Sequence, residues 1–220
     1  MIIRNGKIVT WGEPNEILEG KALLIQDGLI QEIGNESDLL AAHHGEEVLD
    51  AQGQLVMPGL ICAHTHFYGA FSRGMAVPGE PSRNFQEILA NLWWKLDKGL
   101  DEDGVRYSAL ALLADATRYG CTTLFDHHAS PNCIDGSLDI EADAVVESGL
   151  RASLCYEVTD RDGEERALAG IRENGRFIGN VQSGKYDPML RAHFGLHASL
   201  TISEETLEKC LAENNGRAGF

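Results

Sequence analysis

Two histidines that stand two residues apart, His64 and His66, end an apolar run that follows a Pro-Gly corner. Side chains at positions i and i+2 of a β-strand point to the same face, so the two imidazoles would share one side of the strand. A catalytic zinc ion takes about three protein ligands and keeps one position for water. The pair therefore predicts half of a divalent-metal site, and the other ligands must come from elsewhere.

Further histidines follow the ends of later predicted strands. The chain places four polar residues there, in the order Asp126, His127, His128 and His197. Because parallel strands deliver the side chains at their carboxyl ends to a common edge, we expect these residues near His64 and His66. His193 lies on the body of a strand, and we expect it to be buried and structural. His43 and His44 lie in a polar stretch, where we expect solvated surface residues.

The elements that must position these side chains alternate between strand and helix from residue 58 onward. An apolar stripe with helical spacing predicts a helix over 101–120, capped by Asp101. The other expected elements are strands over 121–126, 151–158 and 189–199, helices over 139–148 and 203–216, a helical insertion over 84–100, and a polar connection after residue 158. Strands joined by helices in series give a parallel sheet or barrel. No Gly-rich phosphate-binding loop follows a strand, so nucleotide-binding folds lack support.

The first 57 residues have a different character, with short strands and closely spaced turns. Turn signals occur at Asn5-Gly6, Asp27-Gly28 and Gln52-Gly53, and the first two predict tight hairpins. We therefore expect a β-sandwich segment over 1–57 and a partial barrel over 58–220. The predicted fold class is α/β: a β-sandwich segment followed by the first half, about four βα units, of a TIM (β/α)8 barrel.

Charge and cysteine content limit the partners. The formal net charge is −16, so the surface would repel nucleic acids and anionic membranes, and we expect neither as a partner. Five widely spaced cysteines without a signal peptide indicate reduced thiols in a cytoplasmic protein. No apolar run reaches the roughly 18 residues that a membrane span needs.

The strings "VMPGLICAHTH" and "GLHASLTISEETL" resemble the amidohydrolase superfamily, within the aminohydrolase branch of s-triazine hydrolases, guanine and S-adenosylhomocysteine deaminases and SsnA-type enzymes. The resemblance implies that His64 and His66 are ligands of a catalytic zinc ion, with iron as the alternative, and that His197 contacts substrate. His127, His128 and Phe67 are further candidates for the substrate pocket. The predicted fourth strand contains no lysine, which favours a single-metal, deaminase-type site.

The family pattern places later metal ligands and the catalytic carboxylate on strands that would follow Phe220. We therefore expect the chain to be the N-terminal half of a hydrolase that cleaves a C–N bond of a heterocyclic amine through a metal-activated water. Alone, it should be inactive and prone to self-association, because an open half-barrel exposes strand edges. The expected partners are a small-molecule substrate and further copies in a homo-oligomer. A non-catalytic half-barrel module (or truncated paralogue) and a cyclic-amide hydrolase are the alternatives.

Overall fold

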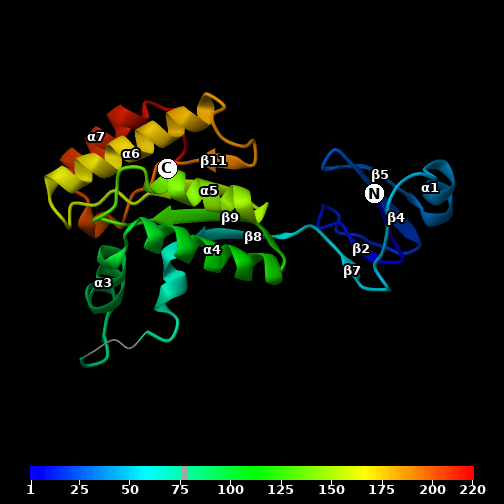
Figure 1. The fold of residues 1–220 in the computed structure, drawn as a ribbon, viewed down its shortest axis with the longest axis horizontal. Helices are drawn as coiled ribbons and strands as arrows, with labels where there is room; N and C mark the ends of the chain where they lie inside the picture. The colour runs from blue at the N-terminus through cyan, green and yellow to red at the C-terminus, as the bar shows by residue number, and fades with distance from the viewer. Residues whose placement is uncertain (76–78) are drawn as a thin grey trace. The chain divides into compact units, whose positions relative to one another are not determined.

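The computed structural model describes residues 1–75 and 79–220, which form two compact units, Met1–Gly59 and Leu60–Phe220 (Figure 1). Each unit has its own sheets and its own buried side chains. Among the described residues, no helix combines the length and the apolar character needed to cross a membrane.

The N-terminal unit contains two small sheets and one helix. The four-stranded sheet has the order β5-β4-β1-β6 and the three-stranded sheet the order β3-β2-β7. The strands are β1 (Ile2–Arg4), β2 (Lys7–Val9), β3 (Ile17–Leu18), β4 (Lys21–Gln26), β5 (Leu29–Asn35), β6 (Val48–Asp50) and β7 (Leu55–Val56). Helix α1 (Glu36–Ala42) buries Leu39 against Ile2 and Leu24, and the sequence had indicated only a polar connection there. The sandwich arrangement of this unit stays a prediction.

The two predicted hairpins have different outcomes. Asp27 and Gly28 both have positive φ and join β4 to β5, with Gln26 opposite Leu29, so this tight hairpin is confirmed. The Asn5-Gly6 hairpin is wrong, because β1 pairs with β4 and β6 while β2 pairs with β3 and β7. The chain turns at Asn5 to pass from one sheet to the other.

The C-terminal unit is built on a parallel sheet of order β11-β10-β9-β8. Its strands are β8 (Leu60–Thr65), β9 (Cys121–His128), β10 (Arg151–Tyr156) and β11 (Leu190–Ala192). Leu124, Ala152 and Leu190 are register partners on one face and are buried in the main core. The opposite face carries Phe125, which borders a cavity of about 380 Å³. One face of the sheet therefore packs in the core, and the other borders a cavity.

Helices cover the buried face of the sheet (Figure 1). They are α4 (Glu102–Arg118), α5 (Ser137–Ser148) and α6 (Glu164–Gln182), while α7 (Glu204–Asn214) packs against α6 and buries Cys210 beside Ile171 and Ile178. The stripe predicted for α4 is observed, because Val105, Ala109 and Leu113 are fully buried. Asp101 caps this helix by accepting a hydrogen bond from the Gly104 N–H, as the sequence predicted.

Helix α6 corrects the sequence interpretation. The segment after residue 158 was expected to be a polar connection, yet it contains a helix of 19 residues. Its buried side includes Glu173 and Asn174 beside Ile171 and Phe177. Asn174 accepts a hydrogen bond from the Tyr156 N–H, so polar side chains of this helix bind the sheet directly. The buried apolar residues Ala167, Ile171 and Ile178 still follow helical spacing, so the sequence carried the signal of this helix.

Helix α5 begins in an unusual way. Its N-cap residue is Gly136, which has no side chain to accept a hydrogen bond from the first turn. The Glu173 carboxylate of α6 accepts from the N–H groups of Gly136 and Leu138, at 3.1 and 3.2 Å. Arg176 in turn pairs with Glu173 at 2.7 Å. A neighbouring helix therefore supplies the cap of α5.

Between β8 and α4, the chain forms a series of short helical turns. They are η1 (Phe67–Ser72), α2 (Phe85–Ile88), η2 (Leu89–Trp93), α3 (Trp94–Leu96) and η3 (Asp97–Gly99). The predicted insertion over 84–100 is thus helical, but a π-helical turn at η2 interrupts it. Asn84 caps its start by accepting a hydrogen bond from the Glu87 N–H.

Candidate active site

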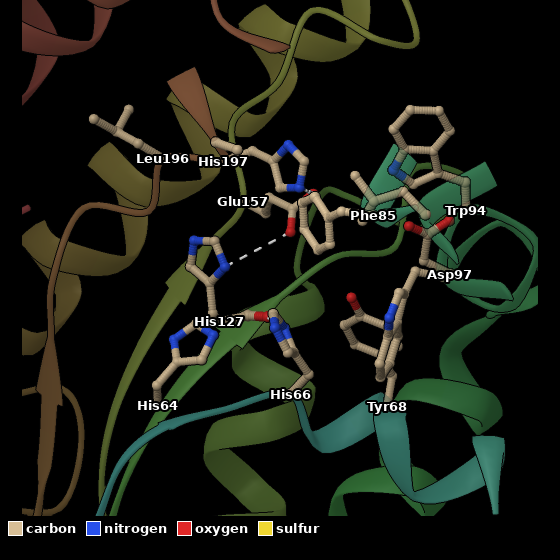
Figure 2. Close-up of a pocket in the computed structure, with 13 residues that line it drawn as sticks. His64, His66, Tyr68, Phe85, Trp94, Asp97, His127, Glu157, Leu196 and His197 are labelled. Atoms are coloured by element: carbon tan, nitrogen blue, oxygen red, sulfur yellow. Dashed lines mark hydrogen bonds and ion pairs between the residues drawn. The ribbon is translucent and has the colours of Figure 1, made fainter. Parts of the chain in front are cut away.

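His64 and His66 lie together at the carboxyl end of β8 (Figure 2). Their ring centroids are 4.8 Å apart and their planes are nearly perpendicular. The register between β8 and β9 shifts between Cys62 and Thr65, so the strand bulges beside His64. His64 is exposed and His66 is half-buried. The structure thus brings together the two imidazoles that the sequence paired.

One nitrogen of His66 is already engaged. Its Nδ1 lies 2.6 Å from the backbone carbonyl oxygen of His127 on β9. A carbonyl oxygen only accepts, so Nδ1 carries the proton and Nε2 presents its lone pair. Burial lowers the pKa of His66, which keeps the ring neutral. A neutral imidazole oriented by a carbonyl is the form in which histidine binds metals.

His127 lies on the same side as this pair, with its ring centroid 5.8 Å from His64 and 5.6 Å from His66. Burial lowers its pKa to about 3, and the neighbouring imidazoles act in the same direction. Its Nδ1 lies 3.6 Å from Oε2 of Glu157, the contact drawn as a dashed line in Figure 2. The sequence prediction that His127 lies near the pair therefore holds in the geometry.

Glu157 is a site residue that the sequence reasoning missed. It follows β10 directly, is 4% exposed, and has a pKa raised to about 8 by burial, although Arg161 opposes that shift. Its carboxyl group lies between two imidazoles, 3.6 Å from His127 and 3.8 Å from Nε2 of His197. The available signal was its position at the carboxyl end of the third parallel strand, the rule already applied to the histidines.

His197 reaches the site from the segment after β11, where a parallel bridge joins Leu196 to Val158. Its Nδ1 contacts the Thr201 hydroxyl, whose own proton is donated to the Ala198 carbonyl at 2.8 Å. Nδ1 must therefore donate, and Nε2 presents a lone pair toward Glu157. Burial lowers the pKa of His197 to about 4, so this ring is also neutral.

These side chains line a cavity of about 390 Å³, and aromatic residues form the wall opposite the histidines (Figure 2). The wall consists of Tyr68, Phe85, Trp93 and Trp94 from the helical turns before α4. Arg161 is held behind it by Asp97 at 2.5 Å and lies over the Trp94 ring at 5.3 Å. The cavity thus combines imidazoles, the buried carboxyl groups of Glu157 and Asp97, and planar apolar surfaces.

Two other sequence candidates, Phe67 and His128, lie elsewhere. Phe67 does not line the cavity: it is fully buried in the main core, because the chain turns into η1 at this residue, and Tyr68 takes the wall position. His128 is also fully buried and faces Glu141 of α5, because successive strand residues point to opposite faces. His193, expected to be buried, is half-buried, bonds Ser153 at 2.9 Å and borders the second cavity.

The donor atoms fit a divalent metal in two overlapping ways. His64 and His66 supply two imidazoles on one strand end. A second grouping has donor atoms of His66, His127 and Glu157 within 4.8 Å of one another. Imidazole with one carboxylate suits zinc, iron and nickel alike. Lys185 does not line this cavity, because its Nζ lies 3.9 Å from Asp139 elsewhere in the unit, so it cannot bridge two metal ions there.

Comparisons with known proteins identify the family of the chain. The model of the amidohydrolase family matches residues 55–217. The chain is 30% identical over 215 residues to the 5'-deoxyadenosine deaminase of Methanosarcina barkeri, covering 98% of the chain and 46% of that protein. It is 32% identical over 210 residues to the 5-methylthioadenosine/S-adenosylhomocysteine deaminase of Pyrococcus furiosus, covering 94% and 45%. The chain spans about half the length of the curated relatives it matches.

Solved structures show the same fold at lower identity. Guanine deaminase from Clostridium acetobutylicum with bound guanine has a TM-score of 0.79 at 14% identity, covering 98% of this chain and 50% of that one. Atrazine chlorohydrolase from Arthrobacter aurescens TC1, complexed with zinc, has a TM-score of 0.75 at 19% identity, with the same coverage. The fold of the chain therefore resembles about half of each of these proteins.

Proposed function

We propose, from the premise that this chain belongs to the amidohydrolase family, that it supplies part of the metal site and substrate cavity of a hydrolytic deaminase. The observation that carries this proposal is the placement of His64 and His66, with ring centroids 4.8 Å apart, at the mouth of a cavity walled by aromatic side chains. Active sites of barrel enzymes lie at this end of the strands.

His64 and His66 would hold the metal, zinc in the first place and iron as the alternative. We choose this pair over the grouping that includes His127 because His64 and His66 match the motif of the family. A divalent metal bound there makes a water ligand acidic enough to act as a nucleophile near neutral pH. The His66 proton on Nδ1 keeps Nε2 directed away from the His127 carbonyl and available as a ligand.

The remaining residues would bind and orient the substrate. A planar ring can lie against Tyr68 and Trp93, and the Nε2 lone pair of His197 can accept a hydrogen bond from it. Glu157, with a pKa of about 8, can hold or release a proton near neutral pH beside these groups. Together these features support a neutral heterocycle that bears an amino group, and the relatives named as deaminases of adenosine derivatives favour the same class.

Because the chain is proposed to supply only part of the site, the test is release of ammonia from adenosine, guanine and melamine by a zinc-loaded protein that spans the full length of the relatives, with the His66→Asn variant as the blank. Release that stops on chelation and returns with zinc supports the proposal. Zinc binding at one ion per chain without release from any of these amines by that longer protein would instead favour the non-catalytic module. We further propose that the protein forms a homo-oligomer, which sedimentation of the same preparation would measure.

The Glu157→Gln variant separates the two donor groupings. Under the proposed assignment this change leaves zinc affinity near the wild-type value, because Glu157 is not a ligand. A loss as large as that of His66→Asn would place the ion among His66, His127 and Glu157 instead. Gln keeps the shape of the buried side chain, so packing is not altered by the comparison.

A further inference from the structure

Behind the cavity lies a second group of titratable side chains that the proposed chemistry does not use. Asp126, His128 and Glu141 are fully buried, and their donor atoms lie within 4.8 Å of one another. Asp126 and His128 point from β9 toward α5, while His127 between them points to the cavity. Nδ1 of His128 lies 2.7 Å from Oε1 of Glu141.

Asp126 reaches across to β8 at the position of the candidate metal ligands. Its Oδ1 accepts a hydrogen bond of 2.6 Å from the N–H of Phe67, the residue directly after His66. The carbonyl of His127, the next residue along β9, accepts from the His66 ring. Two consecutive residues of β9 therefore hold two consecutive residues at the end of β8, just past the bulge where the strand register shifts.

The hydrogen bonds of this group can be traced from Ser130. Ser130 donates its hydroxyl proton to the Cys133 carbonyl at 2.6 Å, so the Nε2–H of His128 must donate to Ser130. Burial lowers the pKa of His128 to about 4, so the ring is neutral and its Nδ1 presents a lone pair to Glu141. With both carboxyls ionised, four buried atoms lack partners among the described residues: Asp126 Oδ2, His128 Nδ1 and both oxygens of Glu141.

A proton on each carboxyl group removes this deficit. Protonated Glu141 donates to Nδ1 of His128, and protonated Asp126 donates to Glu141. Every contact in the chain from Asp126 to Ser130 then joins one donor to one acceptor, and the group is neutral overall. Neutrality matters because, within residues 1–75 and 79–220, no lysine or arginine forms an ion pair with either carboxyl group.

We propose that Asp126, Glu141 and His128 form a neutral, proton-sharing brace that fixes the end of β8, with Asp126 as the positioning residue for His66. The proposal rests on the proposed metal site at His64 and His66. The brace binds the backbone N–H of Phe67, which lies past the paired part of β8. By holding this N–H, it fixes the direction of the His66 imidazole, which belongs to the preceding residue.

Amide variants test the brace because asparagine and glutamine reproduce the protonated acids. In Asp126→Asn, Oδ1 still accepts from Phe67 and the amide donates to Glu141, so zinc affinity should stay near the wild-type value. Asp126→Leu has similar size but leaves the Phe67 N–H without an acceptor. We expect its zinc affinity to fall about tenfold or more, as for other groups that orient a ligand. Competition with a chelator measures both.

A matched control is Glu173→Gln, which alters a second buried glutamate that caps α5 but does not contact β8. It should lower stability and leave zinc affinity unchanged, which separates positioning from general loss of structure. Infrared spectra at neutral pH test the brace without any metal, because protonated carboxyl groups absorb at a different frequency from carboxylates. Besides a band from protonated Glu157, which Glu157→Gln removes, two such bands are expected, one removed by Asp126→Asn and one by Glu141→Gln, even if Asp126→Leu does not fold.

Three results would overturn the brace. Absence of the infrared bands would mean ionised acids. If Asp126→Asn binds zinc as weakly as Asp126→Leu does, the acceptor oxygen of residue 126 does not position His66. A second zinc ion per chain that Glu141→Gln removes would mean that a cation, not shared protons, neutralises the group. If His64→Asn leaves zinc affinity unchanged, the proposed metal site is wrong, and the infrared bands still decide the brace.

Discussion

The His66 imidazole donates its Nδ1 proton to the backbone carbonyl of His127, across 2.6 Å and between neighbouring parallel strands. This bond fixes both the tautomer and the direction of the ring. A backbone acceptor cannot change its protonation state, so the orientation of His66 is independent of pH over the range in which the ring stays neutral.

The first prediction concerns the metal. His64→Asn and His66→Asn should each weaken zinc binding by at least about tenfold, since loss of a ligand costs more than loss of a group that orients one. His44→Asn is the matched control, because this exposed histidine lies in the N-terminal unit. Zinc content after dialysis against a chelator series measures all three. Equal content in every variant would contradict the assignment.

A second prediction concerns pH. Burial raises the pKa of Glu157 from 4.5 to about 8 in the folded chain. A raised folded pKa gives stability that is full below the unfolded value and is lost as pH rises toward the folded one. Relative to Glu157→Gln, the metal-free wild type should therefore lose unfolding free energy between about pH 5 and pH 8, by at most about 1.4 kcal/mol per pH unit. Urea unfolding measures this, and parallel pH curves for the two proteins would refute it.

The third prediction concerns Gly195, two residues before His197. A Cβ there would lie 2.2 Å from the Tyr156 carbonyl oxygen and 2.8 Å from the Cys155 sulfur. Because the nearest atom belongs to the backbone of β10, the clash cannot be relieved by a side-chain rotation. Gly195→Ala should destabilise the chain by about 2 kcal/mol or more. Gly45→Ala, where no atom lies within 4 Å of the added Cβ, should be nearly neutral in the same denaturation assay.

The fourth prediction concerns self-association. Strand β8 stands at the end of the sheet order, and its Ile61 side chain is 65% exposed. An apolar edge strand is a template for pairing with another chain, and a lysine at such a position opposes it. Ile61→Lys should therefore shift sedimentation toward the monomer. Tyr119→Lys, at a position 71% exposed after α4, should not, and an equal effect of both would point to net charge instead.

The helix α4 and the histidine pair could be predicted because the signals are local. Asp101 caps the helix and Val105, Ala109 and Leu113 repeat with helical spacing, so a single window of sequence carries the pattern. The same holds for the hairpin at Asp27. Local geometry determines these features, and tertiary contacts do not alter them.

Other features depend on contacts between distant segments. The alternation of side-chain direction along a strand was used to pair His64 with His66, but not for residues 126–128. There it directs His127 to the cavity and its two neighbours toward α5. A lone glutamate after a strand gives a weak signal, which is why Glu157 was missed. Helix α6 was missed although Ala167, Ile171 and Ile178 follow helical spacing. What the sequence could not show is that Glu173 and Asn174 are buried against partners on α5 and β10.

The cap that Glu173 gives to α5 has a consequence for the order of folding. The first turn of α5 is completed by a residue that leaves the ribosome 35 residues after Leu138, so α5 and its preceding strand cannot reach their final stability alone. The second and third strand-helix units should then gain structure as one cooperative step. Native-state hydrogen exchange would show this as equal opening free energies for the start of α5 and the middle of α6. In a Glu173→Gln variant the two values should differ.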